Sequence, residues 1–124
     1  MKFQIVLLCL FFLVELNATP FYFKSYDMED GLSNNHVTCC VQDDYGFMWF
    51  GTRDGLNRFD SKKFYTFKSY SSEKGSLMSS YILDLAKSPT GQIWVSTNLG
   101  LQKYDYQTDS FTLIDFTKGI NCYS

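Results

Sequence analysis

The chain repeats one stretch of sequence at a fixed offset of 45 residues, and this repeat limits what the chain can fold into. Residues 46–60 read GFMWFGTRDGLNRFD, and residues 91–105 read GQIWVSTNLGLQKYD. The matching positions are Gly46, Trp49, Thr52, Gly55, Leu56 and Asp60 in the first copy and Gly91, Trp94, Thr97, Gly100, Leu101 and Asp105 in the second. Repeats of this length are typical of proteins in which each copy forms one small unit and neighbouring units share a core.

Each copy has the pattern of four short strands. Residues 36–43, 47–52, 56–60 and 64–69 are rich in aromatic and β-branched residues, and turn-forming residues separate them. The stretch FMWFGT is apolar or small on both faces, whereas a half-exposed strand would alternate with polar residues. A four-stranded unit with a recurring tryptophan predicts an all-β fold, made of two four-stranded antiparallel blades of an incomplete β-propeller.

The N-terminal residues predict export. Lys2 is followed by an apolar run over residues 3–14, then by polar residues and the small Ala18, which is the order of a secretory signal. The run is short for a membrane-spanning helix, which needs about 20 apolar residues. We therefore expect a signal peptide, helical where it is structured, with an uncleaved membrane anchor as the alternative.

These patterns predict the organisation of all 124 residues. We expect a signal peptide at 1–18, a lead-in strand and loop at 19–35, blade 1 at 36–69, an inter-blade loop at 70–80, blade 2 at 81–116 and the truncated start of a third repeat at 117–124. Because propellers have about four to eight blades, two copies predict a fragment of a longer propeller.

Composition argues against several classes of function. The net charge is −2 and the charges are mixed, so the chain lacks the basic stripe of a nucleic-acid surface. Cys39 and Cys40 are neighbours in an expected strand and point to opposite faces, and His36 is the only histidine. We therefore predict no metal site and no cofactor, and interpret these cysteines as small apolar side chains.

The repeated aromatic and acidic residues have a structural interpretation. Trp49 and Trp94 are interpreted as wedges between blades, because a repeated tryptophan usually repeats for packing; stacking on a sugar ring is the functional alternative. Acidic residues lie at turns and strand ends, which favours capping over catalysis. They are Asp43, Asp44, Asp60 and Asp105. We predict no catalytic residue in this chain.

The two copies resemble a known family of repeats. GLSNNHVTCCVQDDYGFMWFGTRDGLNRFD and SLMSSYILDLAKSPTGQIWVSTNLGLQKYD look like the two-component-regulator propeller repeat, and the resemblance covers roughly residues 21 to 116. The first copy has the complete D-x-x-G-x-x-W-x-G-T-x-x-G-L core. The second copy departs from it at Ser88 and Ser96.

This resemblance implies the N-terminal periplasmic sensor region of a hybrid two-component histidine kinase of the Bacteroidetes type. In such proteins the propeller senses oligosaccharides and controls a phosphorelay that regulates genes for polysaccharide utilisation. The implied partners are the remaining blades, the kinase of a full-length protein anchored in the inner membrane, an oligosaccharide and a second copy in a homodimer. The alternatives are an exported propeller enzyme acting on glycans and a protein-binding propeller scaffold.

The candidate ligand contacts lie in two kinds of loop. The loop that enters each blade and the turn between its second and third strands emerge at the same end of a propeller. The polar and aromatic residues there suit sugar hydroxyls and ring faces, although turns favour such residues in any case. The candidates are Asn35, His36, Arg53, Asp54, Tyr81 and Asn98.

Overall fold

The computed structural model describes residues 19–70 and 72–116. The signal peptide and the third repeat that the sequence predicts lie outside the described residues. A short 3-10 helix, η1 (Met28–Asp30), precedes two β-sheets. The first sheet contains β1 (Val37–Gln42), β2 (Met48–Thr52), β3 (Gly55–Phe59) and β4 (Phe64–Phe67); the second contains β5 (Ile82–Lys87), β6 (Ile93–Thr97), β7 (Gly100–Asp105) and β8 (Ser110–Leu113).

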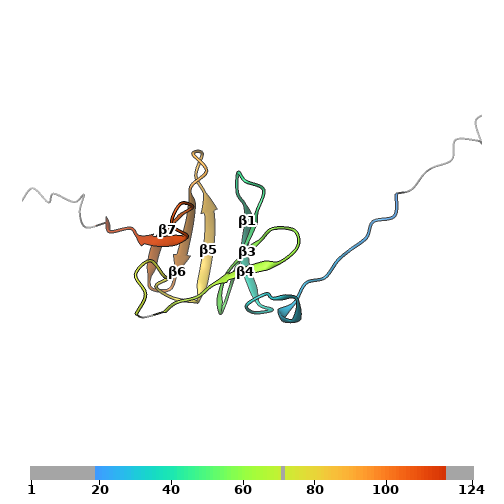
Figure 1. The fold of residues 1–124 in the computed structure, drawn as a ribbon, viewed down its shortest axis with the longest axis horizontal. Helices are drawn as coiled ribbons and strands as arrows, with labels where there is room; N and C mark the ends of the chain where they lie inside the picture. Colours follow the sequence, from blue (N-terminus) through green and yellow to red (C-terminus); the bar gives the residue numbers. More distant parts are fainter. Residues whose placement is uncertain (1–18, 71, 117–124) are drawn as a thin grey trace, which may run out of the picture.

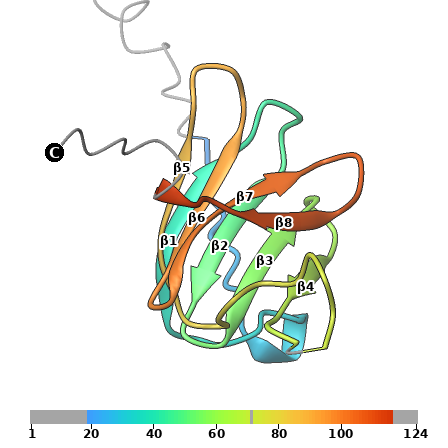
Figure 2. The same ribbon diagram turned by 90° about the vertical axis from the view of Figure 1, so that its left-hand side faces the viewer.

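Both sheets are four-stranded antiparallel meanders whose spatial order follows the sequence. Their registers agree at the repeat offset. Trp49 pairs with Val41 and Arg58 in the first sheet, and Trp94 pairs with Ala86 and Lys103 in the second. The predicted all-β fold with two four-stranded blades is confirmed, and we call the sheets blade 1 and blade 2 (Figures 1 and 2).

The two blades pack against each other and share one apolar core. Trp49 is fully buried in it, and its ring contacts Phe67 from blade 1 and Tyr104 from blade 2, with centroids 5.8 and 4.8 Å away. Ile82, Ile93 and Val95 are also fully buried. Trp49 therefore fills the space between the blades.

Trp94 has a different environment, although its register matches that of Trp49. Trp94 is only half-buried, whereas its strand neighbours Ile93 and Val95 are fully buried against blade 1. Alternation along a strand places successive side chains on opposite faces, so Trp94 lies on the face of blade 2 that points away from blade 1. Among the described residues, Trp49 is therefore the one repeated tryptophan that lies between two blades.

The innermost strands, β1 and β5, approach each other closely. Thr38 donates its hydroxyl hydrogen toward two carbonyl oxygens, those of Ile82 at 2.8 Å and Gly51 at 3.0 Å, and so links the blades. A Cβ atom at Gly51 would come within 2.6 Å of the Ile82 side chain and 2.5 Å of the Cys39 sulfur. A glycine is therefore required here for the close approach of the strands.

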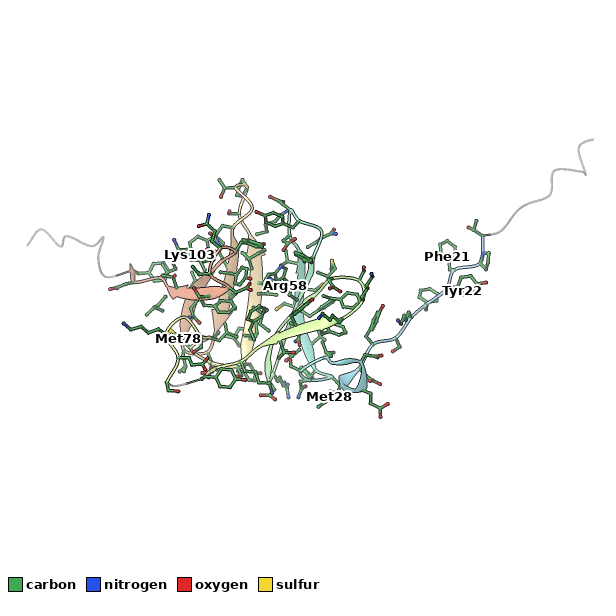
Figure 3. The ribbon with its side chains drawn as sticks, in the orientation of Figure 1. Phe21, Tyr22, Met28, Arg58, Met78 and Lys103 are labelled. Carbon is green, nitrogen blue, oxygen red and sulfur yellow. The ribbon has the colours of Figure 1, made fainter. Side chains whose placement is uncertain are left out.

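The lead-in segment differs from the expected lone strand. Residues 21–26 form no strand. Phe21 and Tyr22 lie on an extended stretch that leaves the body of the molecule, and both are almost fully exposed (Figure 3). Tyr26 returns to blade 1, where its ring meets those of Phe59 and Phe64 at 4.9 and 5.7 Å.

Two further observations concern export and cysteine chemistry. In the ranges that the structure describes, no helix has the length and apolar character needed to cross a membrane. Cys39 and Cys40 are both free thiols, one half-buried and one exposed. Burial raises the pKa of the Cys39 thiol, which keeps it protonated and unreactive near neutral pH.

Candidate functional site

The six residues proposed as ligand contacts lie at one end of the two blades. Val37 pairs with Thr52, and the amide of Arg53 donates to the carbonyl of His36 at 3.3 Å, so the entry to blade 1 lies beside the β2–β3 turn. In blade 2, Ile82 and Thr97 pair in the same way, next to Tyr81 and Asn98. Blade 1 thus presents Asn35 and His36 from its entry and Arg53 and Asp54 from its turn, and blade 2 presents Tyr81 and Asn98.

A repeated threonine builds the turns that present Arg53 and Asn98. Thr52 donates its hydroxyl to the carbonyl of Gly55 at 2.9 Å and accepts the amide of Asp54 at 3.1 Å. Thr97 makes the matching bonds to Gly100 and Leu99, at 3.1 and 3.2 Å. Because these threonines are buried, the turns have a fixed shape and direct the intervening side chains to solvent.

All six candidate side chains are exposed, but two of them already have partners. Asp54 forms an ion pair with Lys68 at 2.7 Å, and the side-chain oxygen of Asn35 accepts the amide of Met28 at 3.0 Å. The side chains of His36, Arg53, Tyr81 and Asn98 make no hydrogen bond to other described residues, and they remain available for a ligand.

Two buried amides that sequence reasoning missed hold the loops at this end. Asn57 accepts the amide of Ser33 at 3.0 Å and donates to the Ser33 hydroxyl at 2.7 Å. Gln102 accepts the amide of Met78 at 2.8 Å. Asn57 and Gln102 are related by the 45-residue offset, and so are their partners Ser33 and Met78. The sequence signal for these contacts was a side-chain amide at the same position of both copies.

Asp43 ties together the opposite end of the blades. Its carboxylate accepts the amides of Tyr45 and Phe47, both at 2.9 Å, the indole N–H of Trp49 at 2.7 Å and the hydroxyl of Tyr106 at 3.0 Å. The structure therefore gives Asp43 a larger role than turn capping, because the same carboxylate fixes the inter-blade tryptophan and a tyrosine of blade 2. Burial, followed by the bond to Asp43, raises the pKa of Tyr106, which stays neutral.

Arg58 lies between the blades, close to this end (Figure 3). Its guanidinium carbon is within 5.2–5.7 Å of four ring centroids, those of Phe47, Trp49, Tyr65 and Phe67. Arg58 also donates to the Tyr104 hydroxyl at 2.8 Å and forms an ion pair with Asp109 at 3.2 Å. These contacts engage one terminal nitrogen of the guanidinium and join the two blades, whereas the buried Nε of Arg58 has no hydrogen-bond partner among the described residues.

The other carboxylates at strand ends hold turns. Asp60 accepts the amides of Lys62 and Lys63, both at 2.9 Å, and the Lys63 and Lys62 amides hold the pKa of Asp60 below its usual range. Asp105 accepts the amide of Gln107 at 2.8 Å. No cluster of three His, Cys, Asp or Glu side chains suited to a metal ion occurs in residues 19–70 and 72–116.

Comparisons with known proteins agree with this architecture. Residues 31–54 match the family model described as two component regulator propeller. The extracellular domain of the putative hybrid two component system BT3049 from B. thetaiotaomicron is 36% identical, with a TM-score of 0.69 over 78% of this chain and 14% of that one. The corresponding domain of BT4673 from the same organism is 25% identical, with a TM-score of 0.55 over 64% of this chain and 11% of that one.

A curated relative has a longer sequence still. The protein named Histidine kinase P4, from Formosa agariphila, is 46% identical over 67 residues, which are 52% of this chain and 5% of that protein. The fold and these similarities define a pair of adjacent β-propeller blades. The match to the two component regulator propeller model lies in residues 31–54, and the chain spans a small part of the length of the relatives that it matches.

Proposed function

We propose that this chain supplies two neighbouring blades of the ligand-sensing propeller of a hybrid two-component system. The main support is the 36% identity and TM-score of 0.69 to the extracellular domain of a putative hybrid two component system. A second support is the 46% identity to a protein named as a histidine kinase. The chain itself has a binding role in this proposal, and catalysis belongs to a kinase elsewhere in the full-length protein.

The proposed ligand is an oligosaccharide that contacts the end of the blades bearing His36, Arg53, Tyr81 and Asn98. These side chains combine a cation, an amide, an imidazole and an aromatic ring, which are groups that recognise sugar hydroxyls and the apolar faces of sugar rings. Turns held by buried threonines present two of them on fixed supports. Several blades would share one ligand, so this chain contributes part of the site.

The proposed location is the periplasm, because the similar solved structures are extracellular domains and the sequence predicts a secretory signal. In the full-length protein we expect the remaining blades to close the ring, a membrane anchor to connect it to the kinase, and two copies to form a homodimer. Ligand binding would favour one arrangement of the dimer and so change the rate of autophosphorylation.

The test uses the full-length protein in membrane vesicles. Isothermal titration with pooled plant and host oligosaccharides measures binding, and transfer of labelled phosphate measures kinase activity. We expect a pool that binds and alters autophosphorylation, and both effects should weaken in the double variant Arg53→Ala, Asn98→Ala. The control is Lys62→Ala, at an exposed turn on the opposite end.

Other outcomes would favour other functions. Cleavage of an oligosaccharide by the extracellular part would indicate an exported enzyme. Binding to a protein, with no binding to any sugar pool, would indicate a scaffold. Sugar binding that is unchanged in the double variant would place the ligand elsewhere on the propeller.

A further inference from the structure

Two tyrosines from different blades meet at the end of the molecule opposite to the candidate ligand contacts. Tyr45 lies in the turn between β1 and β2, and Tyr106 lies just after β7. Their ring centroids are 4.8 Å apart, with 52° between the ring planes. The β1–β2 and β5–β6 turns extend together at the top of Figure 1, while Arg53 and Asn98 belong to the turns at the other end of the strands.

Three open hollows adjoin this tyrosine pair. The first, of about 200 Å³, also contacts Asp44 and Gln92. The second, of about 470 Å³, also contacts Gln92 and Gln107, and the third, of about 410 Å³, also contacts Gln107 and Arg58. We call the surface formed by Tyr45, Tyr106, Gln92 and Gln107 the tyrosine groove. The largest of its hollows falls in the range of small-molecule sites, roughly 300–1,000 Å³.

The repeat does not carry these tyrosines from one blade to the other, although Tyr106 packs against the shared core. Side chains with a shared structural role recur at the 45-residue offset, as the turn threonines do. At the same offset, Thr90 stands in the place of Tyr45, and Ser61 stands in the place of Tyr106. The aromatic pair is therefore a local addition to this junction.

Burial and hydrogen bonding distinguish the two rings. Tyr106 is half-buried and donates its hydroxyl to Asp43 at 3.0 Å, which fixes the orientation of its ring. Tyr45 remains 71% exposed, and its hydroxyl makes no hydrogen bond to any other described residue. One ring is thus held in place while the other offers most of its surface to solvent.

The charged residues that line the tyrosine groove balance one another in number once Lys87 is included, and Lys103 and Asp105 at the largest hollow carry opposite charges. Asp44 pairs with Lys87 at 2.6 Å, and Arg58 pairs with Asp109 at 3.2 Å. A ligand with a net charge would have to compete with these pairs, so the groove favours an uncharged ligand.

The side-chain amides of Gln92 and Gln107 supply further polar groups to the tyrosine groove. Gln92 uses its side-chain NH₂ to bind the carbonyl oxygens of Ile93 and Tyr104, which leaves its side-chain oxygen as an acceptor. The side chain of Gln107 makes no hydrogen bond within the described residues, and it is exposed. An aromatic face beside amide donors and acceptors suits a molecule with an apolar face and hydroxyl groups around its edge.

We propose that the tyrosine groove binds an uncharged, hydroxyl-rich ring, that is, a neutral sugar residue. Tyr45 is the stacking surface, Tyr106 is the supporting wall, and Gln92 and Gln107 are the hydrogen-bonding groups. This site is separate from the end that carries Arg53 and Asn98, and it does not depend on the sensor role proposed above.

The test is saturation-transfer NMR on the intact propeller-containing protein. The probe is a pool of glucose, galactose, mannose, xylose, maltose and cellobiose at millimolar concentration, where weak single-ring contacts are populated. We expect transfer to at least one sugar, a loss of at least about tenfold in Tyr45→Ala, and retention in Tyr45→Phe, which keeps the ring. Gln107→Ala should weaken transfer, while Arg53→Ala and Asn98→Ala should leave it unchanged.

Four results would overturn the proposal. They are the absence of transfer to every sugar, transfer that survives in Tyr45→Ala, transfer lost only in Arg53→Ala or Asn98→Ala, and displacement of the neutral sugars by glucuronate at lower concentration. The third result would support the candidate ligand contacts described earlier, so the two proposals can fail separately. Because Tyr45 is mostly exposed, Tyr45→Ala should fold, and its melting temperature checks this directly.

Discussion

Replacing Asp43 with serine isolates the bond between the carboxylate and the inter-blade tryptophan. Ser88 occupies the same position in blade 2, where its hydroxyl accepts the amide of Gln92 at 3.0 Å. Asp43→Ser should keep the matching turn bond to Phe47. It removes the acceptor of the Trp49 indole N–H, and the fully buried Trp49 has no water to replace it.

The expected cost follows from these contacts. A hydrogen bond to a charged acceptor is lost, and a buried donor is left unsatisfied, so the free energy of unfolding should fall by about 2–4 kcal/mol. Tyr106 also loses its acceptor, but it is half-buried and should add little because water can reach it. The matched control, Ser88→Ala, removes the bond to the Gln92 amide and a bond to the Thr90 hydroxyl at a half-exposed site, and should cost about 0.5–1.5 kcal/mol.

Urea denaturation of the chain measures this difference. The sequence has two tryptophans, so in a Trp94→Phe background the fluorescence reports on Trp49 alone. We expect a lower midpoint for Asp43→Ser at an unchanged slope, because the surface exposed on unfolding is the same. If Asp43→Ser costs no more than Ser88→Ala, the indole bond contributes nothing and our account of Asp43 is wrong.

Three further predictions concern the junction between the blades. Gly51→Ala should destabilise the chain by about 1–3 kcal/mol through overpacking against Ile82, whereas Ser96→Ala at the matching position should change stability little; equal effects in thermal melts would contradict this. The pKa of Tyr106 is raised in the folded state, so the contribution of Tyr106 to stability should be complete below about pH 10, the pKa of an unperturbed tyrosine. This contribution should be lost as the pH rises above that value. In thermal melts across the pH range, Tyr106→Phe should reduce the loss of stability at alkaline pH. The segment 19–124 should self-associate with increasing concentration in light scattering, because blade 2 exposes apolar side chains on its outer face; a monomer with one sharp unfolding transition would argue against this.

Sequence periodicity was sufficient to predict the blades, because the residues that define each strand and turn recur at the repeat offset. Trp49 and Trp94 mark the second strand of each sheet, and the structure places them in the same register. The glycines and threonines of the turns are tied to local backbone geometry, which a short motif can specify: Gly55 and Gly100 have φ values of 140° and 154°.

Contacts between distant residues could not be predicted in the same way. The four partners of Asp43 include Tyr106, which is 63 positions away in the chain and belongs to the other blade. Arg58 likewise binds the Tyr104 hydroxyl and pairs with Asp109, and both of these partners belong to blade 2. A motif describes one blade, whereas these interactions are created when two blades come together.

For the candidate ligand contacts, the sequence predicted the loops but not the state of each side chain. His36, Arg53, Tyr81 and Asn98 lie at one end of the blades. Asp54 and Asn35 occupy the same loops, but Lys68 and the Met28 amide engage them. Neither partner was visible from residue spacing, because each comes from a segment outside the motif.

The buried amides of Asn57 and Gln102 bear on how such a chain gains or loses a copy. Each amide binds the backbone of the connector that precedes its own blade, at Ser33 and Met78 respectively. A connector and the blade that follows it therefore form one structural unit. A duplication or an engineered insertion cut just before the connector keeps the amide with its backbone partner, whereas a cut at the first strand separates them and leaves a buried polar side chain without its bond. Chimeric arrays joined upstream of residues 33 and 78 should therefore fold better than arrays joined at residues 37 and 82.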